Sequence, residues 1–161
     1  MADTKNIELK AGLGDVKFGM DVEQVKTLLG EPSHREVIGK DVEMPTTLLI
    51  YEDLGLSLFF DFPLQFNKDL GMPWDNTADF EQISDKAILA CIDVNAEDVM
   101  LLGHKIIGKS SKEISEMMDG NGITDLTTDQ ETWGETRISS EAYAIDFFFE
   151  QDKLVSVNLG L

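Results

Sequence analysis

The feature that most constrains this chain is an internal similarity between positions 89 residues apart. Residues 14–19 (GDVKFG) are matched by residues 103–108 (GHKIIG), and the glycines keep the same spacing. Self-similarity at a fixed offset indicates that one supersecondary unit occurs more than once. The sequence therefore predicts two related units in tandem.

Each matched segment leads into a predicted amphipathic helix. Asp21 and Ser110 are followed three residues later by Gln24 and Glu113, which is the capping-box pattern of a helix start. Residues 30–32 (GEP) and 119–122 (DGNG) are typical of helix ends. Between start and end, apolar residues recur at helical spacing: Val22, Val25, Leu28 and Leu29 in the first copy, and Ile114, Met117 and Met118 in the second.

Alternating segments follow at the same offset. Residues 54–61 (LGLSLFFD) align without a gap with residues 143–150 (YAIDFFFE), and both alternate as half-buried strands do. The pair Gln151-Asp152 is typical of a hairpin turn. Further strands are expected at 35–38, 47–51 and 86–94 and, in the second copy, at 123–127, 136–140 and 153–161. The predicted fold class is α+β, with two tandem repeats, each a short helical segment packed on an antiparallel sheet of about four strands.

The two copies differ in length just before their last strands. Between the aligned strand and the last strand, the first copy has 85 minus 61, or 24, residues. The second copy has 152 minus 150, or 2. The surplus of 22 predicts an insertion at about 62–83 that contains Trp74. Long insertions in compact repeats are usually surface loops and often functional ones, although this loop could simply pack its own aromatic side chains. The predicted units are 1–95, with the insertion, and 96–161.

Charge and composition restrict the classes of partner. The 31 acidic residues against 13 lysines and arginines leave a formal net charge of -18. Nucleic acid and anionic membrane surfaces are repelled by such a field, whereas a basic protein partner is attracted. The alternative is that the acidic surface only keeps the protein soluble. One cysteine excludes an internal disulfide framework, and the absence of a signal core or membrane-span run predicts a cytoplasmic location.

Residues 18–25 (FGMDVEQV), together with 29–32 (LGEP), resemble the opening motif of the beta-lactamase-inhibitor-protein-like fold. That group includes secreted beta-lactamase inhibitor proteins, which are tandem repeats, and the small lipoprotein of the outer-membrane barrel-assembly machinery, which has one repeat. The resemblance implies a helical segment on a four-stranded antiparallel sheet whose outer face is presented to another protein. In the second copy Gly108 is kept, but Lys109 replaces the methionine.

Departures from that family limit what can be transferred. The chain lacks the export signal and paired cysteines of the secreted inhibitors and the lipid-anchoring cysteine of the assembly lipoprotein. Neither specific activity is therefore carried over. The chain also resembles small acidic two-repeat bacterial proteins that are suspected of toxin immunity.

No catalytic or metal-binding pattern in the sequence is complete. The two histidines, His34 and His104, do not accompany a nucleophile and an orienting acid, and one cysteine with distant histidines does not make a zinc site. Residues 119–130 begin like a calcium loop but have Ile123 at the fifth position and Gln130 at the twelfth. The sequence therefore predicts no catalytic, cofactor-binding or metal-binding residue, and a protein that is not an enzyme.

A partner-binding face is predicted on the side of the sheet that faces away from the helices. Its expected members are aromatic and acidic side chains at alternate strand positions, with one residue of the insertion: Ser57, Phe59, Asp61, Trp74, Leu89, Asp93, Asp146, Phe148 and Glu150. An aromatic centre inside an acidic rim is typical of protein interfaces. The alternatives are that Phe59 and Phe148 are covered within the protein or by a second copy, so the chain is a monomer or a homodimer.

The leading hypothesis is an immunity-type inhibitor that neutralises a cationic toxin such as a nuclease. The alternatives are a cytoplasmic adaptor or structural module, and a small-ligand-binding protein with a cleft near Trp74 and Trp133.

Overall fold

An eight-stranded antiparallel sheet dominates the computed structural model, which describes residues 2–38, 46–61, 87–130 and 135–160. The strand order is β10-β11-β12-β13-β7-β6-β5-β4. In chain order the strands are β4 (His34–Ile38), β5 (Thr46–Tyr51), β6 (Leu56–Asp61), β7 (Ile88–Val94), β10 (Leu126–Gln130), β11 (Glu135–Ser140), β12 (Ile145–Glu150) and β13 (Lys153–Gly160). Within the described residues, the many strands and the two helices agree with the α+β class.

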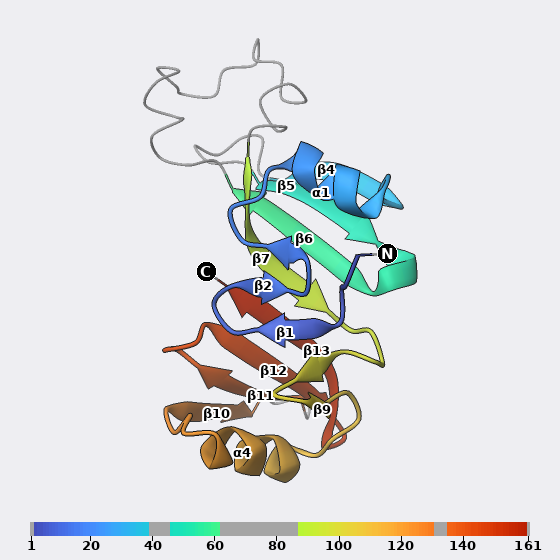
Figure 1. The fold of residues 1–161 in the computed structure, drawn as a ribbon. Helices are drawn as coiled ribbons and strands as arrows, with labels where there is room; N and C mark the ends of the chain where they lie inside the picture. Colours follow the sequence, from blue (N-terminus) through green and yellow to red (C-terminus); the bar gives the residue numbers. More distant parts are fainter. Residues whose placement is uncertain (1, 39–45, 62–86, 131–134, 161) are drawn as a thin grey trace.

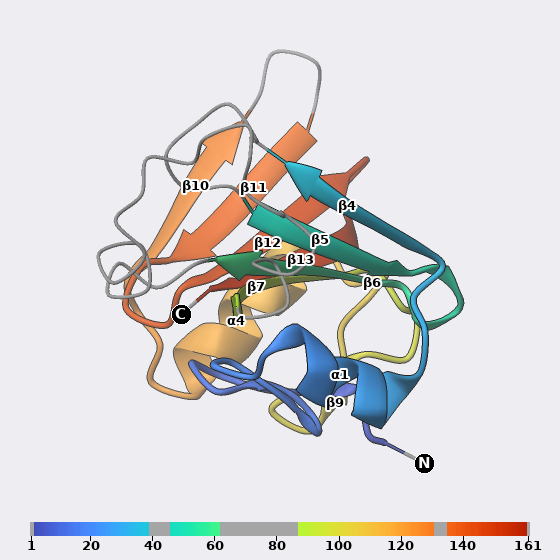
Figure 2. The same cartoon turned by 90° about the horizontal axis from the view of Figure 1, so that it is seen from above.

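One face of this sheet is covered by the two helices and a smaller sheet. Figures 1 and 2 show α1 and α4 on the same side of the large sheet, towards its opposite ends, with the small sheet between them. The helices are α1 (Val22–Leu29) and α4 (Ser111–Gly120). The small sheet has the order β3-β2-β1-β8-β9 and consists of β1 (Asn6–Glu8), β2 (Gly12–Leu13), β3 (Val16–Lys17), β8 (Met100–Leu101) and β9 (His104–Lys105).

The predicted capping boxes are present at both helix starts. The Asp21 carboxylate accepts from the Gln24 amide at 2.8 Å, and the Gln24 side chain accepts from the Asp21 amide at 2.9 Å. Ser110 and Glu113 make the same reciprocal pair at 3.2 and 3.1 Å. These bonds satisfy amides that the first turn of a helix leaves free. Each helix then turns apolar side chains into the core: Val22 and Val25 in α1, and Ile114 and Met118 in α4.

The core lies between the large sheet and the layer formed by the helices and the small sheet. The alternation predicted for the two aligned strands is confirmed, because every second residue is buried there: Leu56, Leu58 and Phe60 in β6, and Ile145, Phe147 and Phe149 in β12. Leu54 instead ends a short 3-10 helix, η1 (Glu52–Leu54), and Tyr143 lies in a turn with 36% of its surface exposed.

The expected sets of four strands do not remain separate sheets. Strand β7 pairs antiparallel with β13, which joins β4–β7 to β10–β13 in one continuous sheet. In the small sheet, β1 pairs in parallel with β8. Hydrogen bonds therefore cross the predicted boundary at residues 95 and 96 in both sheets. Because β7 and β13 pair with each other, neither of them presents an unpaired edge to solvent.

A bulge in strand β7 buries Leu89, which was predicted to lie on the surface. In β7, Phe59 is opposite Cys91 but Phe60 is opposite Leu89, so Ala90 is an extra residue. The extra residue breaks the period-two alternation and turns Leu89 into the core, where it is 0% exposed. The prediction that Leu89 lies on the outer face is therefore wrong.

Strand β13 has a bulge at the matching point, where Val155 is the extra residue. In β13, Phe148 is opposite Ser156 and Phe149 is opposite Leu154, which is 1% exposed. Cys91 therefore occupies the position of Ser156, and not that of Asn158 as a gapless alignment of the last strands suggests. Strand β10 also begins later than predicted, because the Ile123 amide bonds to the Met118 carbonyl at the end of α4.

Candidate protein-binding face

The candidate site is the face of the large sheet opposite the helices, called here the outer face (Figure 2). Directly paired residues of neighbouring strands point to the same side of a sheet, about 4.8 Å apart. The register therefore produces one row that crosses all eight strands, called here the polar row: His34, Ile50, Ser57, Asp93, Asn158, Asp146, Ser139 and Thr127. Seven of its eight members carry polar side chains.

The two predicted aromatic anchors flank this row. Phe59 lies two residues after the row member Ser57 in β6, and Phe148 lies two residues after the row member Asp146 in β12. The strands β6 and β12 run in opposite directions. The rings therefore lie on opposite sides of the polar row. Both are half-buried, and Leu48, directly opposite Phe59, is 7% exposed.

The remaining predicted residues divide between the row, the rim and the undescribed part of the chain. Ser57, Asp93 and Asp146 lie in the polar row and are half-buried. Asp61 and Glu150 are exposed at the strand ends, where Asp61 accepts a 3.0 Å hydrogen bond from Thr46. Trp74, with the predicted insertion at 62–83, lies outside the described residues, as does Trp133.

Two carboxylates of the polar row have no cationic partner. Across the described ranges, neither Asp93 nor Asp146 takes part in an ion pair. Burial raises the pKa of the Asp93 carboxyl above its usual value. A half-buried charge without a counter-ion costs folding free energy, so this face carries a cost that a cationic partner would offset.

The thiol of Cys91 lies beside the centre of the row. Its sulfur is 3.2 Å from the side-chain nitrogen of Asn158 and 3.4 Å from the side-chain oxygen. Burial raises the pKa of the Cys91 thiol, and the nearby carboxylates Asp93, Asp61 and Asp146 raise it further. The thiol therefore stays protonated near neutral pH and is a weak nucleophile.

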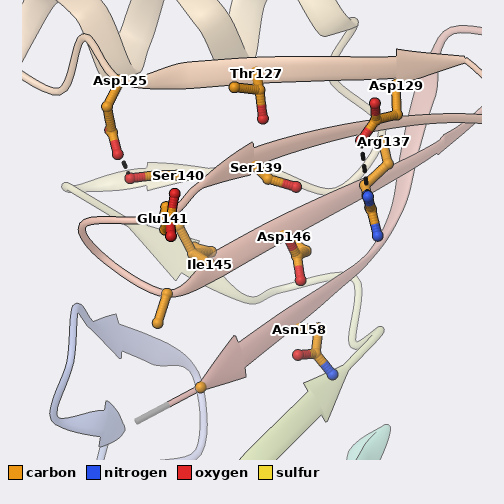
Figure 3. A pocket seen from close by; sticks show the side chains of 12 residues that line it. Asp125, Thr127, Asp129, Arg137, Ser139, Ser140, Glu141, Ile145, Asp146 and Asn158 are labelled. Carbon is orange, nitrogen blue, oxygen red and sulfur yellow. Dashed lines mark hydrogen bonds and ion pairs between the residues drawn. The ribbon is translucent and has the colours of Figure 1, made fainter.

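A hollow of about 490 Å³ opens on the outer face at the end of the row that belongs to β10–β13. Figure 3 shows Thr127, Ser139, Asp146 and Asn158 one after another on four neighbouring strands. The remaining lining residues are Asp125, Asp129, Arg137, Ser140, Glu141, Ala144, Ile145 and Gly160.

Two carboxylates at the border of the hollow are held by the protein itself. Asp129 pairs with Arg137 at 2.7 Å (Figure 3). Asp125 accepts from the Ser140 hydroxyl at 2.7 Å and from the Ala142 amide at 2.9 Å, and these bonds lower the pKa of the Asp125 carboxyl. Both groups fix the loop and strand geometry around the hollow.

Most residues of this hollow are not among the site residues predicted from the sequence. Arg137 and Ser139 occur at alternate positions of the predicted strand 136–140, so the period-two pattern places them on the same face, whereas Asp129 lies beyond the end of the predicted strand 123–127. The pattern does not say which strands are neighbours, and the meeting of Asp146 with Asn158 follows only from the pairing of β12 with β13.

The described ranges contain no group of three or more histidine, cysteine, aspartate or glutamate side chains that could hold a metal ion. Within the same ranges, no helix has the length and apolar composition needed to span a membrane.

Comparison with known proteins yields one weak structural similarity. No protein-family model and no curated protein sequence matches the chain. A crystal structure of an extracellular protein containing a SCP domain, from Bacillus anthracis str. Ames, is similar with a TM-score of 0.45 and 14% sequence identity. The similarity covers 88% of this chain and 43% of that one, so this chain spans less than half of its length. A TM-score below 0.5 does not place the two proteins in one fold.

Proposed function

We propose that this protein is an acidic inhibitor that binds a basic protein through the outer face of its eight-stranded sheet. The observation that carries the proposal is the polar row, in which Asp93 and Asp146 are half-buried and pair with no cation among the described residues. They lie between two half-buried rings, Phe59 and Phe148. A basic protein supplies the missing positive charge, and the rings supply apolar contact.

Local backbone geometry supports a further part of the proposal, that the chain is two copies of one unit, 1–95 and 96–161. Residues 89 positions apart have the same local geometry: Gly19 and Gly108 both have a φ of 91°, and Gly55 and Ala144 have φ of 65° and 50°. The amides of Gly19 and Gly108 bond to Leu89 and Leu154, respectively. Such duplication explains why an aromatic ring occurs on each side of the sheet centre. It also agrees with the resemblance to the beta-lactamase-inhibitor-protein-like fold.

The net charge of -18 defines the chemistry of the partner. Long-range attraction accelerates association with a basic surface and falls with ionic strength, whereas buried contacts control dissociation. Enzymes that act on anionic substrates, such as nucleases, have basic clefts. The proposed activity is therefore occlusion of such a cleft, as in the neutralisation of a cationic toxin in the cytoplasm.

The test has two stages. The immobilised chain is exposed to lysate of its own cells at low salt, and captured proteins are eluted at about 1 M salt, where the Debye length is roughly 3 Å. Each basic protein recovered is then produced separately, and its enzymatic activity is measured with and without an equimolar amount of this chain. Inhibition of a nuclease or another enzyme with an anionic substrate supports the proposal.

The matched variants are Phe148→Ser on the outer face and Leu102→Ser, which changes an exposed apolar residue between β8 and β9 on the opposite side of the large sheet. Phe148→Ser should reduce inhibition at least tenfold, and Leu102→Ser should leave it unchanged. A captured basic protein that keeps full activity in the complex, or equal effects of the two variants, would exclude inhibition through this face.

A further inference from the structure

Among the described residues that line it, the hollow at the β10–β13 end of the polar row has an excess of negative charge and one cationic side chain. Its lining includes the four carboxylates of Asp125, Asp129, Glu141 and Asp146 against the guanidinium of Arg137, a balance of four minus one, or three negative charges. Arg137 is already engaged by Asp129 at 2.7 Å. A cationic group that enters the hollow therefore meets a net attractive field.

Asp146 is the lining carboxylate placed to receive such a group. It is half-buried, and it lies in the polar row directly between Asn158 on β13 and Ser139 on β11 (Figure 3). Among the described residues no lysine, arginine or histidine pairs with it. Its neighbours Asp125 and Asp129 both have partners.

The hydroxyl of Ser139 is a second, independent sign of a missing group. Its oxygen is buried and makes no hydrogen bond, although it lines the hollow one strand away from Asp146. Buried hydroxyls are normally hydrogen-bonded, because desolvation without a partner is costly. A donor that reaches both the Asp146 carboxylate and the Ser139 oxygen would satisfy both groups.

We propose that this hollow receives the guanidinium of an arginine side chain from the basic partner. Arginine fits better than lysine because its planar guanidinium has five fixed donors and is more weakly hydrated than an ammonium. One edge pairs with Asp146, and rotation of the Ser139 side chain turns its Oγ toward the hollow, where it accepts a hydrogen bond from a further N–H. This inference rests on the proposed function and names the group by which the partner is recognised.

The corresponding positions in the first half do not repeat this chemistry. Ser57 stands 89 residues before Asp146, and Ile50 stands 89 residues before Ser139. In the row, Ile50 and Ser57 are directly paired just as Ser139 and Asp146 are. The first half therefore does not repeat this site, and an arginine contact at the β10–β13 end sets the orientation of the partner.

The test uses three blocked tripeptides as probes: acetyl-Gly-Arg-Gly-amide, its lysine analogue and its citrulline analogue, which keeps the shape of arginine without the charge. Backbone amide shifts of the full chain are followed by NMR during titration. The arginine peptide should shift the amides of Ser139, Asp146 and Asn158 saturably, and the citrulline peptide should not. Equal affinity for the lysine peptide, equal shifts with citrulline, or shifts located elsewhere would overturn the inference.

Two charge-removing variants control for the general field of the protein. Asp146→Asn should weaken binding of the arginine peptide at least tenfold. Asp119→Asn, at the exposed end of α4, should change the affinity less than twofold. Ser139→Ala should weaken binding without loss of folding. An equal effect of Asp146→Asn and Asp119→Asn shows attraction by overall charge alone and refutes the site.

The outcome also separates this inference from the proposed function. If Asp146→Asn inhibits the captured enzyme as strongly as wild type does, the inhibitor function stands and the arginine site fails. If the arginine peptide binds at the hollow but no basic enzyme is inhibited, the site stands and the inhibitor function fails.

Discussion

The inner and outer faces of the eight-stranded sheet differ in how similar their side chains are at positions 89 residues apart. On the inner face, Leu58 corresponds to Phe147 and Phe60 to Phe149, and all four are completely buried. On the outer face, the polar Ser139 and the charged Asp146 correspond to Ile50 and Ser57. Close packing restricts the inner positions to apolar side chains, whereas half-exposed positions are free to differ. The buried strand positions therefore keep their apolar character at both ends, whereas the outer positions differ in polarity and charge.

The largest expected effect separates two adjacent phenylalanines on opposite faces. Phe147 is 0% exposed in the core, and Phe148 is half-buried on the outer face. Phe147→Ala should lower the free energy of unfolding by about 3–5 kcal/mol through lost burial and a cavity. Phe148→Ala should cost roughly 1 kcal/mol, as mutations of partly exposed sites usually do. Urea unfolding followed by circular dichroism gives both values, and similar losses would place the two rings in the same kind of environment.

A smaller effect should distinguish the two turns that precede β6 and β12. A Cβ added at Gly55 would lie 2.6 Å from the Asn95 side-chain oxygen and 2.9 Å from the Ala96 amide nitrogen, at a φ of 65°. Gly55→Ala should therefore cost more than the roughly 1–2 kcal/mol of a left-handed alanine. Ala144→Gly should be neutral or stabilising, because Ala144 already has a φ of 50°.

Thermal unfolding of both variants checks this asymmetry. If Gly55→Ala leaves the melting temperature unchanged, the turn relaxes around the new methyl group and the close contact with residues 95 and 96 is not restrictive.

The helix caps should behave alike at both ends of the molecule. Asp21→Ala and Ser110→Ala each remove one half of a capping box, and each should lower the free energy of unfolding by about 1 kcal/mol. Lys112→Ala, on the exposed surface of α4, is the control and should cost less than about 0.5 kcal/mol. A cost confined to one cap would mean that the two helices contribute unequally to the fold.

The smallest effect concerns the charge of Asp93. Its pKa in the folded state is raised by burial, so the folded chain holds this proton more tightly than the unfolded chain does. Stability from this group is present below the usual value of 3.8 and is lost as pH rises through the folded pKa. Asp93→Asn should therefore be slightly more stable than wild type at pH 7, with the difference disappearing near pH 3.

Urea unfolding at the two pH values measures the effect, and Asp119→Asn serves as the control. The same Asp93→Asn variant should bind the basic partner more weakly. A gain in stability together with a loss of binding would identify Asp93 as a residue kept for recognition. If Asp93→Asn is instead less stable than wild type at pH 7, the Asp93 carboxylate has a favourable partner in the folded chain and the prediction is wrong.

Local patterns in the sequence were sufficient for most of the secondary structure. The capping boxes, the two helices, the paired strands β6 and β12 and the turn at Gln151 and Asp152 depend on residues close together in the chain, so their sequence signals are direct. The outer-face positions of Phe59, Phe148, Asp93 and Asp146 followed from simple alternation. Leu89 was misplaced because a bulge inserts one residue without a sequence signal that alternation can detect.

By itself, then, the sequence predicted the helices α1 and α4, the strands of the large sheet with some shifted ends, and the apolar faces of β6 and β12, but not the strands of the small sheet. Only the tertiary structure decided that β7 pairs with β13, that β1 pairs with β8, and that Asp146 lies between Ser139 and Asn158 in a hollow. The physical reason is the range of the interactions. Helix caps and period-two burial act between near neighbours, whereas strand pairing joins residues far apart in the chain according to packing of the whole core.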